Sequence, residues 1–555
     1  MVSGLFLFLL LLLPSPVPAS CRPATPEECK ENQKFIPGYQ LAGEGVDVTT
    51  LQRTGFFSVD LTKYLQKNGT CMLCHNDHQG GERQRLPLAI TDWHAETAKC
   101  HRAVVKTMSH STIDVANSVA KSIRNDWKAG LDVAPKPGVN FQVSIAGSHS
   151  QAADFASGKL QEDEYIFTSD EVECRYYRFH LVRKPPLKTH FSQAIQALPL
   201  KFNSSTQSNY FRLVSEYGTH FITSLNLGGR ATDITALRTC KLALDRITAD
   251  EVAKCLEVEA NVNVLSHGPT TANKKCEEQR KEHGIQGSFH DTYNERHVEV
   301  VGGQHENTAD LIFGVPQGPE QFTAWMATLP ASPGLVSYSL SPLHLLLKPQ
   351  NPRREELRQA VSEYINKRAR WQNCTEPCPP GKVKSSRDPC RCVCLKIGGM
   401  DENCCPQERG LARMEVTIHR AKNLWGDKTT ATDAYVKVYL GGQEWKTTTV
   451  WNNNNPVWGQ WIDFGMVELS RAGPLRVQVW DEDEGWNDDL LGSCDQQPVA
   501  GNSQKISCLC KHGSVEFSYK ATCAAHLKGR KCLEYAPQWD QAAKDHLGLP
   551  SQVAH

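Results

Sequence analysis

The chain is 555 residues long, too long for a single hydrophobic core, so we expect three or four domains of roughly 150 residues each. Lys and Arg together number 61, Asp and Glu also number 61, and the formal net charge is zero. This balance excludes the broad positive field that nucleic-acid binding needs, so we expect no nucleic-acid partner and recognition through local sites.

The first twenty residues form a segment of their own. An uninterrupted apolar run covers residues 5–13, and prolines and small residues follow it. The pattern predicts a secretory signal peptide over residues 1–20, cleaved near Ala19 or Ser20. The run is half of the roughly 18 residues that a spanning helix needs, and no later segment approaches that length. Three sequons fit a secretory route and predict glycosylation at Asn68, Asn203 and Asn373.

The 21 cysteines predict extensive disulfides, because the secretory route is oxidising. An odd count leaves at least one thiol unpaired or intermolecular. Cys71-x-x-Cys74 also has the spacing of redox and zinc motifs, but no second pair at metal spacing accompanies it. We therefore interpret the sparse N-terminal cysteines as structural disulfides: Cys21, Cys29, Cys71, Cys74, Cys100 and Cys174.

Two segments alternate apolar and polar residues. In the first, which follows a turn at residues 135–138, the apolar positions are Phe141, Val143 and Ile145. In the second, they are Val258, Ala260, Val262 and Val264. Alternation of period two predicts strands with one apolar face. The strongly polar stretch at 270–283 predicts a solvated helix.

The run Tyr217-Gly218-Thr219-His220-Phe221 is followed by the pair Gly228-Gly229. Alone, this run could begin any strand, and a histidine in such a place is by default a hydrogen-bonded structural residue. Together the two motifs resemble the signature of the membrane attack complex/perforin (MACPF) family. A glycine pair weakens a strand and lets it bend, which matches the bent central sheet of that family.

Seven cysteines occur within residues 374–405, a segment too short to bury a useful core: Cys374, Cys378, Cys390, Cys392, Cys394, Cys404 and Cys405. Their spacing resembles an EGF-like module held by about three bridges, with the seventh cysteine free to reach another domain. Cys240 is a candidate partner for it.

From Leu411 onward, short β-rich runs separated by turns predict an antiparallel sandwich of roughly 110 residues. We expect its cysteines to form disulfides, at Cys494, Cys508, Cys523 and Cys532. Cys510 is additional to the pairing that the MACPF resemblance implies, and we expect it to be the odd thiol.

Two acidic loops of this sandwich, residues 426–433 and 481–489, carry the sharpest chemical signal. If they lie at the same end, five or six carboxylates converge, and packed carboxylates repel one another unless a cation neutralises them. Ca²⁺ suits such loops because it takes roughly 6 to 8 oxygen ligands in irregular geometry. The pattern therefore predicts a calcium site, with a merely acidic surface as the alternative.

Three motifs occur in order around these loops: Thr-Asp-Ala-Tyr-Val-Lys-Val at 432–438, Asn-Pro-Val-Trp at 455–458 and Val-Trp-Asp-Glu-Asp at 479–483. They resemble a C2-type calcium-dependent phospholipid-binding domain. The resemblance implies a ligand set of Asp427, Asp433, Asp481, Asp483 and Asp489, with Asp488 and the Gly426 carbonyl as candidates.

Three tryptophans, Trp425, Trp451 and Trp486, accompany the acidic loops. Large amphipathic rings suit the lipid headgroup layer, so we expect them to anchor the docked domain. The alternative for Trp425 and Trp451 is a place in the core, because a sandwich also needs large buried rings.

These segments give the domain organisation: a signal peptide at 1–20, a MACPF pore-forming domain at 21–372, an EGF-like module at 373–409, a C2-type domain at 410–522 and a C-terminal tail at 523–555. The expected fold class is multidomain α+β. It combines a bent antiparallel sheet flanked by helical clusters, a small disulfide-rich module and an all-β sandwich.

The family resemblance implies that both alternating segments are helical in the soluble monomer and refold into transmembrane β-hairpins. A lone hairpin in lipid leaves unpaired amides, so many copies must close a barrel. The chain would be a secreted, calcium-dependent pore-forming cytolysin, stored in cytolytic granules, that acts on target-cell phospholipid membranes and delivers granule proteases. The alternative is a calcium-dependent, complement-like membrane-binding component without a pore of its own.

Enzyme motifs are missing from the sequence: there is no G-x-S-x-G, no H-E-x-x-H and no G-x-x-x-x-G-K. His305-Glu306 lacks the second histidine that a zinc-protease helix would supply. We therefore expect a protein that is not an enzyme.

Overall fold

The computed structural model describes residues 21–133, 146–265, 271–304, 311–313, 319–370, 377–378, 382–386, 391–394, 398–426, 430–483, 485, 487–502 and 505–537. Several positions that the sequence singles out lie outside these ranges. They are the signal peptide at 1–20, Phe141, Val143, Ile145, Asn373, Cys374, Cys390, Asp427 and Trp486.

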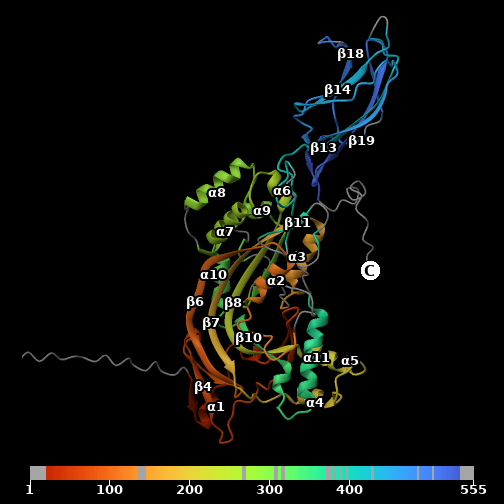
Figure 1. Cartoon of the computed structure of the whole chain (residues 1–555). Helices are drawn as coiled ribbons and strands as arrows, with labels where there is room; N and C mark the ends of the chain where they lie inside the picture. The colour runs from red at the N-terminus through yellow and green to blue at the C-terminus, as the bar shows by residue number, and fades with distance from the viewer. Residues whose placement is uncertain are drawn as a thin grey trace, which may run out of the picture.

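A seven-stranded antiparallel sheet forms the centre of the first domain, with its long strands curving through the molecule in Figure 1. Its main path runs β3-β2-β8-β7-β6, and β9 and β10 also pair with β8. The bounds are β2 Glu44–Asp47, β3 Gln52–Phe57, β6 Ile90–Ser109, β7 Tyr165–Leu181, β8 His220–Arg238, β9 Arg296–Val301 and β10 Gly334–Pro342.

The glycine pair lies where β8 changes partner. β10 pairs with β8 up to Gly228, and β9 takes over from Arg230. A Cβ on Gly228 would lie 1.9 Å from the carbonyl oxygen of Cys174, and one on Gly229 would lie 2.5 Å from the Trp325 ring. The β7–β8 register also shifts beside this point. Only residues without a side chain fit here, which allows the sheet to bend.

Helices connect the sheet strands and cover both of its faces. Between β6 and β7 the chain forms α2 Thr112–Ala120 and α3 Gln151–Glu162, which pack on Ile234 and Ala236 of β8. Between β8 and β9 it forms α6 Thr239–Leu244, α7 Ala249–Leu265, α8 Thr271–Glu282 and α9 Phe289–Thr292. Asp233 neighbours Ile234 on β8, so its side chain points to the opposite face of the sheet, together with that of its pairing partner Asp170. Glu257 of α7 interacts electrostatically with Asp170, so α7 covers this second face.

The alternating stretch at 257–264 is helical here, so the strand that alternation alone predicts is wrong for this structure. The helix buries Val252, Leu256, Ala260 and Val264. These positions are four apart and therefore satisfy a helical repeat as well as an alternating one. The solvated helix expected at 270–283 is confirmed as α8, which has no buried residue.

The remaining elements of the first domain lie around the sheet. They are β1 Cys21–Ala24, α1 Pro26–Glu31, η1 Tyr39–Leu41, β4 Cys71–Asn76, η2 Asp77–Gln79, β5 Glu82–Leu86, α4 Thr189–Ala197, α5 Gln207–Tyr217, α10 Pro319–Thr328, η3 Leu343–Leu346 and α11 Arg353–Arg368. The short strands β11 Lys382–Lys384 and β12 Cys392–Cys394 form a hairpin in the cysteine-rich module.

The predicted sandwich is present with a core of its own. One sheet has the order β16-β13-β21-β19, with β20 beside β21, and the other has the order β15-β14-β17-β18. The bounds are β13 Leu411–Lys422, β14 Ala434–Leu440, β15 Gln443–Lys446, β16 Val457–Glu468, β17 Leu475–Asp481, β18 Asp489–Gln496, β19 Gly501–Asn502, β20 Ile506–Leu509 and β21 Ser514–Cys523. The short hairpin of β22 Leu527–Lys528 and β23 Glu534–Tyr535 follows.

Disulfides brace every domain. Among the described residues they join Cys21–Cys74, Cys29–Cys71, Cys100–Cys174, Cys240–Cys405, Cys255–Cys276, Cys378–Cys392, Cys394–Cys404, Cys494–Cys508 and Cys523–Cys532. Cys510 is the free cysteine of this part of the chain. The bond between Cys240 and Cys405 ties α6 of the first domain to the cysteine-rich module.

Candidate functional site

The acidic loops meet at one end of the sandwich because three strand ends meet there. β14 begins at Ala434, which pairs with Asp481 at the end of β17, and Asp481 pairs with Asp489 at the start of β18. The backbone N–H of Asp433 donates to a carboxylate oxygen of Asp481 at 2.7 Å. The sequence-predicted residues Asp433, Asp481 and Asp489 therefore share one edge of the domain.

Gly426 allows the first loop to lie directly against the second. A Cβ at this position would lie 1.6 Å from the Asp481 carboxylate, so any larger residue would push the two apart. Asp481 itself is buried. The glycine thus creates a close approach between loop backbone and a carboxylate, as a site with mixed backbone and side-chain oxygen ligands requires.

The carboxylates here accept hydrogen bonds from separate donors. Asp488 accepts from the Tyr435 hydroxyl at 2.6 Å, and this bond holds the pKa of the Asp488 carboxyl below its usual range. Asp433 accepts from the backbone N–H of Asn452. Glu482 pairs with Lys446 at 3.5 Å. Repulsion between the carboxylates is therefore relieved by donors from the neighbouring strands β14 and β15 and from the backbone of Asn452.

Within the described ranges, no group of three His, Cys, Asp or Glu side chains is close enough to hold a metal ion. Asp427 lies outside these ranges, so the full set of converging carboxylates expected from the sequence stays a prediction. The donor set still fits Ca²⁺, since Asp433, Asp481, Asp483, Asp488 and Asp489 offer hard oxygen ligands at one edge and Gly426 admits a backbone ligand beside them.

Two of the three tryptophans project from the sandwich. Trp425 is 51% exposed and contacts His512, and Trp451 is 64% exposed. A place in the core is therefore excluded for both. Trp425 directly precedes Gly426, and Trp451 adjoins Asn452, whose N–H binds Asp433. The acidic edge is thus flanked by large exposed rings.

The motif at 217–221 anchors the central sheet. The Thr219 hydroxyl accepts the Val48 N–H at 3.0 Å and also bonds the carbonyl oxygen of Val46 at 3.1 Å. His220 lies 2.8 Å from the Trp127 carbonyl oxygen, and burial lowers the pKa of its imidazole to about 4. A buried neutral histidine held by a carbonyl is structural, as the default interpretation expects.

Known protein families match each of the three domains described above. The model of the MAC/Perforin domain matches residues 35–374, which is more than half of the chain. The chain belongs to the MAC/Perforin family. A perforin-1-like EGF domain matches residues 373–407, and a C2 domain matches residues 412–505.

Two mammalian relatives resemble the chain over nearly its whole length. It is 56% identical to Perforin-1 of Homo sapiens over 93% of both chains, and 55% identical to Perforin-1 of Mus musculus over 97% of both. Complement component C6 of Bos taurus is 28% identical over 47% of this chain and 28% of its own. Among solved structures, GNIP1Aa from Chromobacterium piscinae aligns with 91% of this chain and 92% of its own, at 13% identity and a TM-score of 0.42.

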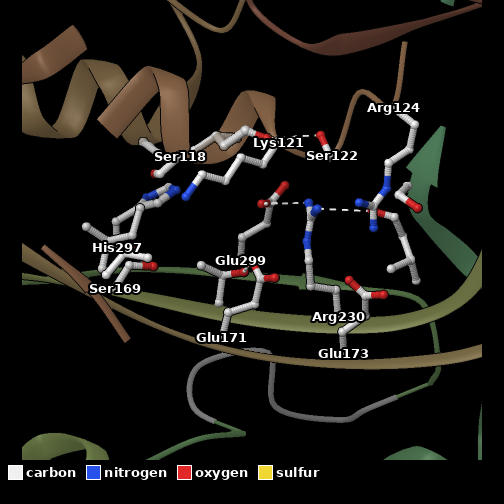
Figure 2. A pocket seen from close by; sticks show the side chains of 17 residues that line it. Ser118, Lys121, Ser122, Arg124, Ser169, Glu171, Glu173, Arg230, His297 and Glu299 are labelled. Carbon is white, nitrogen blue, oxygen red and sulfur yellow. Dashed lines mark hydrogen bonds and ion pairs between the residues drawn. The ribbon is translucent and has the colours of Figure 1, made fainter. Parts of the chain in front are cut away.

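In this MAC/Perforin chain a polar pocket lies between the C-terminal end of α2 and the central sheet, as Figure 2 shows. Lys121, Ser122 and Arg124 lie on the helix side, and Glu171, Glu173, Arg230 and Glu299 lie on the strand side. Arg230 pairs with Glu299 at 3.4 Å, and burial raises the pKa of the Glu171 carboxyl. The first helical cluster therefore contacts the sheet through polar groups here as well as through its apolar contacts with Ile234 and Ala236.

A buried acidic pair lies under the second helical cluster. Asp170 of β7 pairs directly with Asp233 of β8, and both are fully buried. The Asp170 carboxylate accepts no hydrogen bond among the described residues. Burial, with Asp233 and Glu257 of α7 nearby, raises the pKa of the Asp170 carboxyl to about 8, against the opposing effect of Lys106. Sequence reasoning missed this pair, although acidic residues inside buried strands are a signal.

Helix α7 is also held by its own neighbours. Glu259 accepts the backbone N–H groups of Phe289 and His290 at 2.8 and 3.0 Å, and it lies 2.9 Å from the His290 ring. This contact raises the pKa of His290. Sequence reasoning also missed the disulfide between Cys255 and Cys276. Its signal was present, since the two cysteines bracket the alternating stretch. No described helix is long and apolar enough to cross a membrane.

Two of the three sequons lie within the described residues. Asn68 and Asn203 are exposed, and each side-chain oxygen accepts a hydrogen bond from the sequon hydroxyl, Thr70 at 2.7 Å and Ser205 at 2.6 Å. Both sites have room for a glycan.

Proposed function

We propose that this chain, a pore-forming cytolysin of the MAC/Perforin family, docks on target-cell phospholipid membranes through Ca²⁺ bound at its acidic loops. Docked copies assemble into rings and insert the segments around 127–155 and 255–283 as β-hairpins. The chain does this without enzymatic chemistry. Secretion follows a signal peptide at 1–20, storage is in cytolytic granules, and the pore admits granule proteases.

One observation carries the docking step: exposed tryptophans flank an edge built of carboxylates. Carboxylates alone would repel an anionic lipid surface, and the bound cation reverses that charge. The rings of Trp425 and Trp451 then reach the headgroup layer, where amphipathic aromatics are favoured. Asp427 and Trp486 belong to the same loops by sequence and are proposed as the remaining ligand and anchor.

The insertion step is supported by how the helical clusters are joined to the sheet. Each cluster connects two adjacent antiparallel strands, α2–α3 between β6 and β7 and α6–α9 between β8 and β9. Antiparallel neighbours can lengthen as a hairpin without changing topology. The polar pocket under α2 and the buried acidic pair under α7 weaken the attachment of the helices. Insertion requires many copies, because only a closed barrel pairs every strand edge in lipid.

Dye release from protein-free liposomes tests the proposal. With millimolar Ca²⁺ we expect binding and leakage, and without Ca²⁺ neither, since loop-built sites bind at roughly 10⁻⁴ to 10⁻³ M. Asp433→Ala and Asp483→Ala should abolish co-sedimentation with liposomes. Docking without leakage would favour the alternative, a complement-like component with no pore of its own. Undiminished binding of both variants would remove the acidic loops from the mechanism.

A further inference from the structure

A disulfide joins the two helices of the second inserting segment. Cys255 of α7 is bonded to Cys276 of α8, with the two Cα atoms 5.5 Å apart. Cys255 is completely buried. The bond encloses the alternating residues at 257–264, so any refolding of this segment must take place with the bond in place or after it has opened.

The pairing register of β8 and β9 can be continued as far as this bond. β8 and β9 pair without a slip from Arg230 with Val301 to Thr235 with Arg296. In an antiparallel ladder each step forward along one strand is matched by a step back along the other. Twenty steps beyond the pair of Thr235 and Arg296, the ladder reaches Cys255 on one strand and Cys276 on the other.

The two cysteines are therefore directly opposite each other in the hairpin that continues β8 and β9. Residues directly opposite in an antiparallel pair have Cα atoms about 4.5 to 5.5 Å apart, which agrees with the separation that the bond already has between the helices. A ladder slipped by two residues would place the cysteines diagonally, at the limit of what a disulfide can bridge. The covalent bond fits both the helical form and this one hairpin register.

We propose that the Cys255–Cys276 disulfide persists when the segment inserts and sets the register of the hairpin. The inference rests on the proposed function, because it assumes that this segment crosses the membrane. Beyond the bond, each strand has ten residues before the midpoint between positions 265 and 266. That length matches the roughly 9 to 11 residues that cross a bilayer as a tilted strand, so the bond lies at the base of the spanning part.

The register also decides which side chains share a face. Glu257 comes opposite Lys274, an opposite-charge pair of the kind that stabilises adjacent strands. Val258 comes opposite Asn273, and Ala260 opposite Thr271, on the other face. The face with Val258 and Ala260 would contact lipid, and residues 271 and 273 lie on it. The face with Glu257 and Glu259 would contact water, and residues 272 and 274 lie on it.

The first test determines the state of the bond in pores. The full-length protein is added to phosphatidylcholine liposomes with Ca²⁺, leakage is recorded, free thiols are alkylated, and the membrane fraction is digested for mass spectrometry. We expect Cys255 and Cys276 as one linked peptide, as in the soluble protein. Leakage with both cysteines alkylated overturns this inference and leaves the proposed function standing. No leakage at all overturns both.

The second test reads the register with a fluorescent non-natural amino acid, which needs no added thiol. Placed singly at 271 and 273 it should report lipid in pores, and at 272 and 274 it should report water. In Cys255→Ser/Cys276→Ser this contrast should be lost, whereas the matched removal of another bond, Cys378→Ser/Cys392→Ser, should keep it. An unchanged contrast without the bond would show that something else sets the register.

Discussion

β13 and α7 carry the same kind of sequence pattern and have different structures. β13 buries alternate residues, Ala412, Met414, Val416 and Ile418, between β16 and β21, which pair with it on both sides. α7 buries Ala260 and Val264 against helices and the face of the sheet. Alternation therefore indicates which side chains are buried, whereas the packing neighbours determine whether the backbone is a strand or a helix. In our proposal α7 exchanges these neighbours for strand partners in the pore.

We expect the largest effect from a crosslink that fixes α7 to the central sheet. Lys106 of β6 and Asp250 of α7 approach to 4.0 Å, so cysteines at both positions can be joined by a cleavable bifunctional reagent in a Cys510→Ser background. We expect calcium-dependent docking to continue and dye release to be lost, because α7 cannot leave the sheet. Cleavage of the reagent should restore release.

The matched control ties two strands of the sandwich. Arg476 of β17 and Asp495 of β18 form an exposed ion pair at 2.8 Å, and cysteines there can be joined by the same reagent. This tie should leave docking and release unchanged, since the sandwich does not refold. Normal lysis by the protein tied at 106 and 250 would mean that α7 stays helical in the pore.

The second prediction concerns the sandwich alone. Gly426→Ala places a methyl group against the Asp481 carboxylate, which is buried and already holds the Asp433 N–H. We expect the Ca²⁺ concentration for half-maximal liposome binding to rise by about tenfold, which corresponds to roughly 1.4 kcal/mol. Gly398→Ala, where a Cβ meets no atom within 4 Å, is the control. Equal calcium dependence of both variants would contradict the close approach of the two loops.

The third prediction is a pH effect in the region under α7. The pKa of Asp170 is raised in the folded state to about 8 from an ordinary value of 3.8, so its proton stabilises the fold at acid pH and this contribution is lost as pH rises toward 8. The raised pKa of His290 acts in the same direction. We expect the thermal midpoint of the first domain to fall by several degrees between pH 5 and pH 8.

Asp170→Asn isolates this effect, because asparagine has nearly the same shape and does not ionise. Its thermal midpoint should change less over the same range. Where Asp170 is the only group that changes protonation, the substitution should reduce the pH dependence of the free energy of unfolding by roughly 1.4 kcal/mol per pH unit. Asp233, Glu257 and Lys106 are the other charged groups that act on this carboxyl, and they remain in place. Arg296, which lies 3.7 Å from Asp233, also remains. Identical pH profiles for variant and parent would contradict a buried Asp170 that holds its proton.

The sandwich could be predicted from the sequence better than the first domain. Its strands are short, local and separated by turn residues, and its acidic loops are adjacent in the fold because β14, β17 and β18 are neighbours. The position of Gly228-Gly229 at a bend also followed from the sequence. The hydrogen bond that Asp488 accepts from Tyr435 could not be predicted, because the donor comes from another strand.

Long-range pairs account for most of what the sequence could not give. Asp170 and Asp233 are 63 residues apart in the chain and become neighbours only through the β7–β8 register. Cys255 and Cys276 are visible in the sequence, but only the β8–β9 register shows that they would lie opposite each other in an extended hairpin. Among the described residues no strand pairs with 257–264, and α7 packs there against helices and the face of the sheet, which no local pattern contains.

The proposed refolding of α7 can be measured along the helix itself. A fluorescent non-natural amino acid, placed in turn at Val258, Glu259, Ala260, Asn261 and Val262, reports the polarity around each position before and after pore formation on liposomes. In the soluble protein the signal should follow the helical repeat of α7. In pores we expect lipid around positions 258, 260 and 262 and water around positions 259 and 261. A helical repeat that persists in leaking liposomes would contradict this refolding.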